Sequence, residues 1–175
     1  MKKYVLWILL GVLLMGSLIG ALSLSGCQRG TQNPTGNGTA PDFCVLDENG
    51  NEVRLSDFAG KPVVINFWAT WCGYCVREMP DFDKAYEQYP DVVFLMVNAT
   101  DGVHETKEKA MAYVREQGFD FDVYFDTASE ASEAYGITGY PTTVFINADG
   151  DVVSKKVGMI NYKTLQDGIE IIRGK

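Results

Sequence analysis

Histidine is almost absent from this chain of 175 residues, which contains only His104. A protein zinc site needs about four ligands, and one histidine with four cysteines that do not form two close pairs supplies them poorly. A Cys-His nucleophile pair would require His104 itself to meet a cysteine. We therefore expect no bound metal and no hydrolase of this type, and we expect His104 to be a solvated residue near the start of a helix.

Positive charge is also scarce, with 15 lysine and arginine residues against 23 aspartate and glutamate residues and a net charge of -8. An acidic protein is a poor partner for nucleic acid and for anionic lipid headgroups, because both carry negative charge. We therefore expect no nucleic-acid partner, and any attachment to a membrane must come from the N-terminus.

The chain has one long apolar run, from Tyr4 to Leu24, which follows Lys2 and Lys3. This layout is typical of a secretory signal, although about 20 apolar residues can also span a bilayer as an uncleaved anchor. The run ends in Leu24-Ser25-Gly26-Cys27, which resembles the lipobox of bacterial lipoproteins, in which the cysteine is lipidated after cleavage. The sequence predicts a signal peptide over 1–26, a lipidated Cys27 and a chain exposed on the extracytoplasmic face of the cell membrane.

Large apolar side chains are missing from residues 28–40, which are rich in glycine, threonine, asparagine and proline. Such a segment cannot bury enough surface to offset the loss of chain entropy. Residues 27–40 are therefore predicted to form a lipidated, flexible tether. Residues 41–175 remain, a length typical of one domain with its own core.

Cysteine is sparse, and after Cys27 the chain has only Cys44, Cys72 and Cys75. Cys44 lies in a short apolar run and is predicted to be a buried small hydrophobic residue rather than a third redox group. Cys72 and Cys75 are separated by two residues, a spacing found in half of a zinc site, in a structural disulfide and in a redox-active dithiol. A disulfide across so short a loop removes little entropy from the unfolded chain, which favours a dithiol that opens and closes in turnover.

The place of the two cysteines in the chain suggests different roles for them. If Gly73 opens a helix, Cys72 lies at its first turn, where free backbone N–H groups and the positive end of the helix dipole stabilise a thiolate. Cys75 then lies one turn into the helix and is more shielded. This predicts that Cys72 is the attacking thiol and Cys75 the resolving thiol.

The pattern of apolar residues predicts an α/β domain without internal repeats. Continuous apolar runs predict buried strands at 63–68 and 92–97, and the helical spacing between them predicts a helix over 73–89 that Pro80 kinks. Such a strand–helix–strand unit has a right-handed parallel crossover. The other predicted elements are a front hairpin around 47–50, helices at 105–117, closed by Gly118, and at 129–135, strands at 122–125, 143–146 and 152–157, and a last helix that Asn161 caps and that extends to Ile172.

The stretch from Phe67 to Cys75, FWATWCGYC, together with Pro80 and with Tyr140-Pro141-Thr142 before a late strand, resembles the thioredoxin superfamily. Within it, the chain is similar to the membrane-tethered, extracytoplasmic thiol-disulfide oxidoreductases of the TlpA/ResA-like group. Further matches are Ala40-Pro41-Asp42-Phe43, Leu55 to Lys61, Glu78, and Asn66 where thioredoxins usually carry an acid. The resemblance covers essentially all of 41–175. It implies a thioredoxin fold, with a central mixed β-sheet flanked by helices and a short N-terminal β-hairpin.

The resemblance also implies the roles of the site residues. Cys72 and Cys75 form the redox disulfide, and Glu78 is the candidate for shuttling the proton of Cys75. Pro141 is expected to be a cis proline beside the dithiol, where Tyr140 offers backbone hydrogen bonds to an extended substrate and Trp71 belongs to the substrate-binding surface. No metal or organic cofactor is implied. The dipeptide Gly73-Tyr74 departs from the Gly-Pro of thioredoxin, so the redox potential is not carried over.

We therefore expect an enzyme that reduces protein disulfides outside the membrane, for example in cytochrome c maturation. It would act as a monomer and receive electrons from a membrane donor of the thiol-relay type. A thiol peroxidase of the redoxin type is an alternative, but such enzymes place a threonine three residues before the reactive cysteine, where this chain has Ala69. A second alternative is a non-enzymatic surface binding lipoprotein with a static Cys72–Cys75 disulfide. For Glu78, the alternative is a solvated position on the helix surface.

Overall fold

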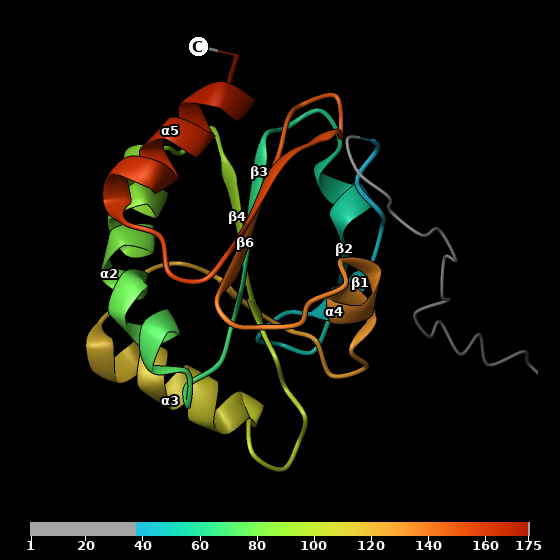
Figure 1. The fold of residues 1–175 in the computed structure, drawn as a ribbon. Helices are drawn as coiled ribbons and strands as arrows, with labels where there is room; N and C mark the ends of the chain where they lie inside the picture. Colours follow the sequence, from blue (N-terminus) through green and yellow to red (C-terminus); the bar gives the residue numbers. More distant parts are fainter. Residues whose placement is uncertain (1–37, 175) are drawn as a thin grey trace, which may run out of the picture.

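The computed structural model describes residues 38–174, so the predicted signal peptide over 1–26, Cys27 and most of the predicted tether lie outside the described residues. Among the residues described, no helix is both long and apolar enough to cross a membrane. The described part forms one β-sheet with helices on both faces (Figure 1).

The centre of the fold is the strand–helix–strand unit that the sequence predicted. β3 (Val63–Trp68) is buried along its whole length, because both of its faces are covered. β4 (Val93–Asn98) runs parallel to it, with Trp68 opposite Asn98. α2 (Gly73–Gln88) connects the two strands and continues through Pro80. The C-terminal ends of β3 and β4 therefore lie side by side, next to the start of α2.

The sheet has seven strands in the order β2-β1-β5-β4-β3-β6-β7. β5 (Val123–Phe125) is parallel to β4. Antiparallel strands complete both edges: β1 (Cys44–Leu46) and β2 (Glu52–Arg54) form the predicted front hairpin, and β6 (Thr142–Ile146) and β7 (Val152–Val157) form the late one. This mixed sheet confirms the thioredoxin fold that the resemblance implied.

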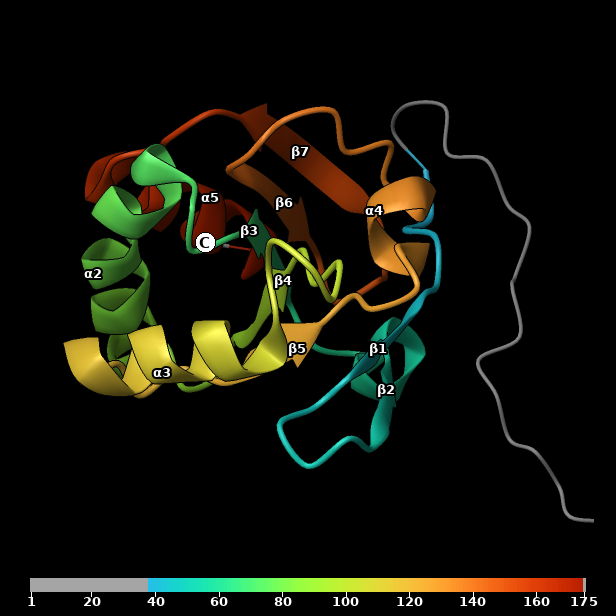
Figure 2. The same ribbon diagram turned by 90° about the horizontal axis from the view of Figure 1, so that it is seen from below.

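Four α-helices in the described part cover the two faces of the sheet unevenly. Figures 1 and 2 show α2, α3 (Lys107–Gln117) and α5 (Tyr162–Ile172) on one side of the sheet, and α4 (Glu130–Ala134) on the other. The short 3-10 helix η1 (Leu55–Phe58) follows β2. The apolar core under α2, α3 and α5 contains both Cys72 and Cys75. The dithiol therefore belongs to the packed interior of this face.

Capping residues set the borders of the helices. Asn161 Oδ1 accepts a hydrogen bond from Thr164 N at 2.9 Å, which confirms the predicted cap of α5. Gly118 has φ 72° and ends α3 as predicted. The prediction that this helix begins at Glu105 is wrong, because Thr106 Oγ1 accepts a hydrogen bond from Lys109 N and caps the helix instead. Glu105 lies before the helix, and its side chain is buried.

The described chain joins the sheet before Pro41. Thr39 forms an antiparallel bridge with Asp151, and Ala40 N donates to Gly150 O at 2.7 Å. Both contacts lie at the β6–β7 turn. Further along, Cys44 is 3% exposed, so its predicted burial is confirmed. That it is not a third redox group stays a prediction.

Candidate active site at the dithiol

Cys72 and Cys75 lie where β3 passes into α2. They form a disulfide with an S–S distance of 2.09 Å. Cys72 is the N-cap residue of α2, and its Sγ accepts a hydrogen bond from Cys75 N at 3.2 Å. The sulfur of Cys72 therefore lies at the positive end of the helix dipole, where free backbone N–H groups stabilise a thiolate.

The two sulfur-bearing side chains differ in access. Cys72 is 6% exposed and Cys75 is 0% exposed. The direction of this difference agrees with an attacking role for Cys72 and a resolving role for Cys75. Because Cys72 has so little exposed surface, a substrate must contact the residues around it to bring its own disulfide to the sulfur.

Exposed aromatic side chains flank the disulfide. Trp71 is 59% exposed, and its ring meets the ring of Tyr140 edge-on, with 5.7 Å between the ring centroids. The Tyr140–Pro141 peptide bond is cis, as the resemblance implied. Tyr74 is also exposed, and the Arg77 guanidinium lies 4.6 Å from the centroid of its ring. The structure thus brings together Trp71 and the loop before β6, which are far apart in the sequence.

Glu78 lies one turn after Cys75 on α2 and is 1% exposed, which rules out the solvated alternative. Its Oε1 accepts a hydrogen bond from Asn66 Nδ2 at 2.8 Å, and its Oε2 accepts one from Ile160 N at 2.9 Å. Burial raises the pKa of Glu78 to about 7; the hydrogen bonds from Ile160 and Asn66 oppose the rise, and the charge of Asp81 adds to it. The carboxyl can therefore gain and lose a proton near neutral pH.

Asn66 connects this carboxyl to the sheet. Its side-chain amide also donates to Thr143 Oγ1 on β6 at 3.2 Å. An amide at this position of β3 can donate to Glu78, which a carboxylate could not do. The buried acid of this site is therefore on α2, and the strand residue is its donor.

Glu105 is a buried glutamate that was predicted to lie in a helix and was not among the predicted site residues. It is 0% exposed, and it accepts hydrogen bonds from the backbone and the hydroxyl of Thr70, two residues before Cys72. The signal that could have found it is Thr106, since a threonine cap predicts that the preceding residue lies outside the helix.

His104 takes no part in the dithiol site. Its side chain is 81% exposed and its Nδ1 lies 3.1 Å from Asp101 Oδ2, so the predicted solvated position is confirmed. Within residues 38–174, no group of three histidine, cysteine or acidic side chains is placed to hold a metal ion.

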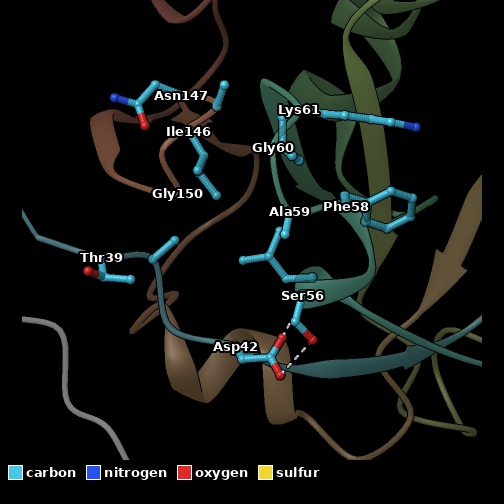
Figure 3. A pocket seen from close by; sticks show the side chains of 14 residues that line it. Thr39, Asp42, Ser56, Phe58, Ala59, Gly60, Lys61, Ile146, Asn147 and Gly150 are labelled. Carbon is cyan, nitrogen blue, oxygen red and sulfur yellow. Dashed lines mark hydrogen bonds between the residues drawn. The ribbon is translucent and has the colours of Figure 1, made fainter.

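A cavity of about 270 Å³ lies at the other end of the sheet (Figure 3). Its lining includes Val63 at the start of β3 and Ile146 at the end of β6, whereas the dithiol follows the opposite end of β3. At its rim, Asp42 accepts hydrogen bonds from Ser56 N and Ser56 Oγ. None of the predicted site residues lines this cavity, so the candidate active site is the dithiol.

Comparisons with known proteins agree with this site. A model of the AhpC/TSA family matches residues 37–155. The chain belongs to the AhpC/TSA family. It is 33% identical to the thiol-disulfide oxidoreductase ResA of Bacillus subtilis over 177 residues, which covers 98% of this chain and 96% of ResA.

Solved structures give the same result. The chain is similar to a thiol:disulfide interchange protein of the thioredoxin family from Chlorobium tepidum, with a TM-score of 0.68 at 25% identity over 82% of this chain and 99% of that chain. It is also similar to the exposed lipoprotein thioredoxin Etrx1 of Streptococcus pneumoniae, with a TM-score of 0.64 at 30% identity over 74% of this chain and 99% of that chain. With the Cys72–Cys75 pair, these relatives identify the chain as a thiol-disulfide oxidoreductase of the TlpA/ResA-like group.

Proposed function

We propose that the protein is a membrane-tethered reductase of protein disulfides on the extracytoplasmic face of the cell. The observation that carries this proposal is the asymmetry of the dithiol: Cys72 caps α2 and keeps a little exposed surface, whereas Cys75 is fully buried one turn away from the buried Glu78. Such an arrangement suits an attacking thiol at Cys72 and a resolving thiol at Cys75 that reacts only with the mixed disulfide.

The reaction proceeds in two exchanges. The Cys72 thiolate attacks one sulfur of the substrate disulfide, and the other substrate sulfur leaves as a thiolate and takes up a proton. Cys75 then loses its proton, attacks Cys72 in the mixed disulfide and releases the second substrate thiol. The substrate gains two electrons and two protons, and the enzyme is left with the Cys72–Cys75 disulfide.

Glu78 is proposed as the acceptor of the Cys75 proton. Cys75 has no exposed surface, so water is a poor acceptor for this proton. A carboxyl with a pKa of about 7 can accept a proton from a thiol and release it again, because its protonated and ionised forms are both populated near neutral pH. The oxidised enzyme must then be reduced by a dithiol, for which we propose a membrane protein of the thiol-relay type.

Trp71, Tyr140 and Pro141 are proposed to bind the substrate. Trp71 and Tyr140 contact each other beside Cys72, so an extended peptide that reaches Cys72 would pass over both. Cytochrome c maturation is the process that the TlpA/ResA-like resemblance favours, with the disulfide of apocytochrome c as the substrate.

Two other functions are less well supported. A redoxin-type peroxidase would have threonine three residues before Cys72, but Ala69 is there and its side chain is buried. A static disulfide in a surface binding lipoprotein would add little stability, because the loop that it closes is very short.

A trapping experiment tests the reductase. In Cys75→Ser, the mixed disulfide cannot be resolved, so we expect Cys72 to remain bonded to substrate proteins in cells, in adducts that dithiothreitol releases. Cys72→Ser is the matched control and should form none. Apocytochrome c among the adducts would support a role in cytochrome c maturation. Failure of the trap together with failure of the unsubstituted protein to reduce insulin would leave the static disulfide, whereas peroxide consumption that depends on Cys72 would favour the peroxidase.

The membrane tether is proposed to be a lipid on Cys27. Leu24-Ser25-Gly26-Cys27 at the end of the apolar run supports it, as does the similarity to an exposed lipoprotein of Streptococcus pneumoniae. Mass spectrometry of the mature protein should show a diacylglyceryl modification that Cys27→Ala removes. A Cys27→Ala chain that kept the lipid-modified mass would contradict the assignment.

A further inference from the structure

The segment that leads into Cys72 has a buried carboxylate as its support. Thr70 N donates to Glu105 Oε1 at 3.0 Å, and Thr70 Oγ1 donates to Glu105 Oε2 at 2.6 Å. Asn98 Nδ2, at the end of β4, donates to Glu105 Oε1 at 2.7 Å. Glu105 therefore connects the end of β4 to the loop between β3 and α2 through three hydrogen bonds.

The backbone around Glu105 is itself fixed. Asp101 Oδ1 accepts hydrogen bonds from the backbone N–H groups of Val103, His104 and Glu105 at 2.7 to 2.9 Å. Gly102 N donates to Glu105 O at 3.0 Å, which closes the turn. These bonds set the direction of the Glu105 side chain without help from α3, which begins later.

Three contacts hold the segment from Trp68 to Cys72. Trp68 O accepts a hydrogen bond from Ala99 N at 2.9 Å, and Cys72 N donates to Ala69 O at 3.2 Å. Between these two points, Thr70 donates its backbone and hydroxyl hydrogen bonds to Glu105. Trp71 has an exposed side chain and adds only its ring contact with Tyr140. The O and Sγ atoms of Cys72 accept hydrogen bonds from Val76 N and Cys75 N within α2, and the Thr70–Glu105 pair holds the segment that leads into them.

We propose that Glu105 is a positioning residue for Cys72, which acts by holding Thr70 so that the Cys72 sulfur stays at the N-terminus of α2. The inference rests on the proposed function in one respect, namely that Cys72 is the attacking thiol. Glu105 acts through its hydrogen bonds to Thr70 and Asn98, and the proton transfer remains assigned to Glu78.

The positional effect and the effect of charge have opposite signs, so they can be separated. If Glu105 holds the loop, its removal moves the sulfur away from the helix N-terminus, destabilises the thiolate and raises the pKa of Cys72. If Glu105 acted mainly as a nearby negative charge, its removal would stabilise the thiolate and lower that pKa. The titratable and charged groups on the elements that meet at Cys72 include Tyr74, Cys75, Arg77, Glu78 and Asp81 on the first turns of α2, Tyr140 before β6, and Asp101, His104 and Glu105 in the turn before α3.

The test is the pH profile of Cys72 alkylation by iodoacetamide in the full reduced protein. We expect Glu105→Ala to move the midpoint upward by about one pH unit, which lowers alkylation about tenfold at pH values well below the midpoint. Glu105→Gln keeps an acceptor oxygen for Thr70 N and should recover most of this shift. Thr70→Val removes only the hydroxyl bond and should shift the midpoint upward by less than Glu105→Ala does.

Glu130→Ala is the matched control, because Glu130 is also a buried glutamate that accepts a backbone hydrogen bond, from Cys44 N at 3.1 Å, but it lies on α4 across the sheet. It should leave the midpoint unchanged although it removes a buried carboxylate. Circular dichroism identifies the temperature range in which every variant is folded. An unchanged or lowered midpoint in Glu105→Ala would overturn the proposal, as would a Glu105→Gln midpoint as high as that of Glu105→Ala.

This outcome is independent of the proposed reductase activity. Alkylation reports on the Cys72 thiolate without any protein substrate. If the unsubstituted protein failed to reduce protein disulfides while Glu105→Ala still raised the midpoint, the proposed function would fail and the positioning role would stand. If the protein reduced insulin and Glu105→Ala left the midpoint unchanged, the positioning role would fail and the proposed function would stand.

Discussion

The buried carboxyl of Glu78 keeps its proton to a higher pH than a carboxyl in the unfolded chain does, because burial raises its pKa from 4.5 to about 7. Between these two values the folded protein binds a proton that the unfolded chain has released. The contribution of Glu78 to the free energy of unfolding is therefore largest below pH 4.5 and falls as the pH rises from there to about 7. The full shift corresponds to about 3 kcal/mol of unfolding free energy.

We predict that Glu78→Gln removes this part of the pH dependence. The neutral amide has no charge to bury, so the variant should gain stability relative to the unsubstituted protein on going from about pH 4.5 to about pH 7, by up to about 3 kcal/mol. Urea denaturation of the oxidised proteins at both pH values measures the difference. Comparing the two proteins cancels the other titrating groups that they share.

The same variant separates a catalytic role of Glu78 from a structural one. If Glu78 takes the Cys75 proton, Glu78→Gln should also slow the release of substrate from the mixed disulfide at neutral pH. Glu130→Gln, at another buried glutamate outside the site, should leave this rate unchanged. Equal rates for Glu78→Gln and the unsubstituted protein would show that the carboxyl is only a buried structural group.

Individual site residues were predictable from the sequence where their chemistry is local. Cys72 and Cys75 belong to one short motif, and Glu78 lies one turn further along the same helix. The partners of Glu78 were not predictable, because Ile160 is 82 residues away and meets it only in the folded chain. Glu105 was missed for the same reason, since Thr70 is 35 residues before it.

Helices and strands were predicted well where capping or continuous burial determines them. The sequence of β3 is a continuous apolar run because both of its faces are covered. The side chain of Asn161 caps the start of α5, and the backbone of Gly118 ends α3, so both residues mark helix ends by their local chemistry. α3 was predicted to start too early, because the acidic Glu105 is compatible with a first helical turn and its buried partners are distant in sequence.

The packing between elements could not be predicted from such local patterns. β1 joins the sheet through the single pair Leu46 and Phe125, which no periodicity indicates. α5 approaches β6 so closely that a Cβ on Gly168 would lie 2.3 Å from the ring of Phe145. In the sequence, Gly168 is only a weak helix former inside a helical pattern. The contact with Phe145 explains why this position has no side chain.

Thr39, near the start of the described chain, and the dithiol lie at opposite ends of the sheet. Thr39 pairs with Asp151 just before β7, whereas Val157 at the other end of β7 pairs with Thr142, next to Pro141. If Cys27 is anchored in a membrane, the chain enters the domain at the end that lies away from Cys72. The dithiol is then free to face other proteins, which suits an enzyme whose substrates and electron donor are both proteins.

The charge of the molecule bears on the direction of electron flow. Stabilising the thiolate of the attacking cysteine favours the reduced form and makes a dithiol more oxidising, and related proteins extend from about -270 mV for thioredoxin to about -120 mV for DsbA. Gly73 and Tyr74 place no cation between the cysteines, and the chain carries a net charge of -8. Arg77 is the cation of this turn, and it lies over the Tyr74 ring and donates to Gly73 O.

We therefore predict a reduction potential below about -200 mV, in the range of proteins that donate electrons to disulfides. Equilibration with dithiothreitol or glutathione couples measures it, with alkylation of Cys72 as the readout. Tyr74→His is the matched variant: an imidazolium beside Cys72 stabilises its thiolate, so the potential should become less negative. A potential near -120 mV in the unsubstituted protein would contradict the reductase and make the protein a disulfide donor. A potential that did not respond to Tyr74→His would show that the residues between the cysteines do not set it.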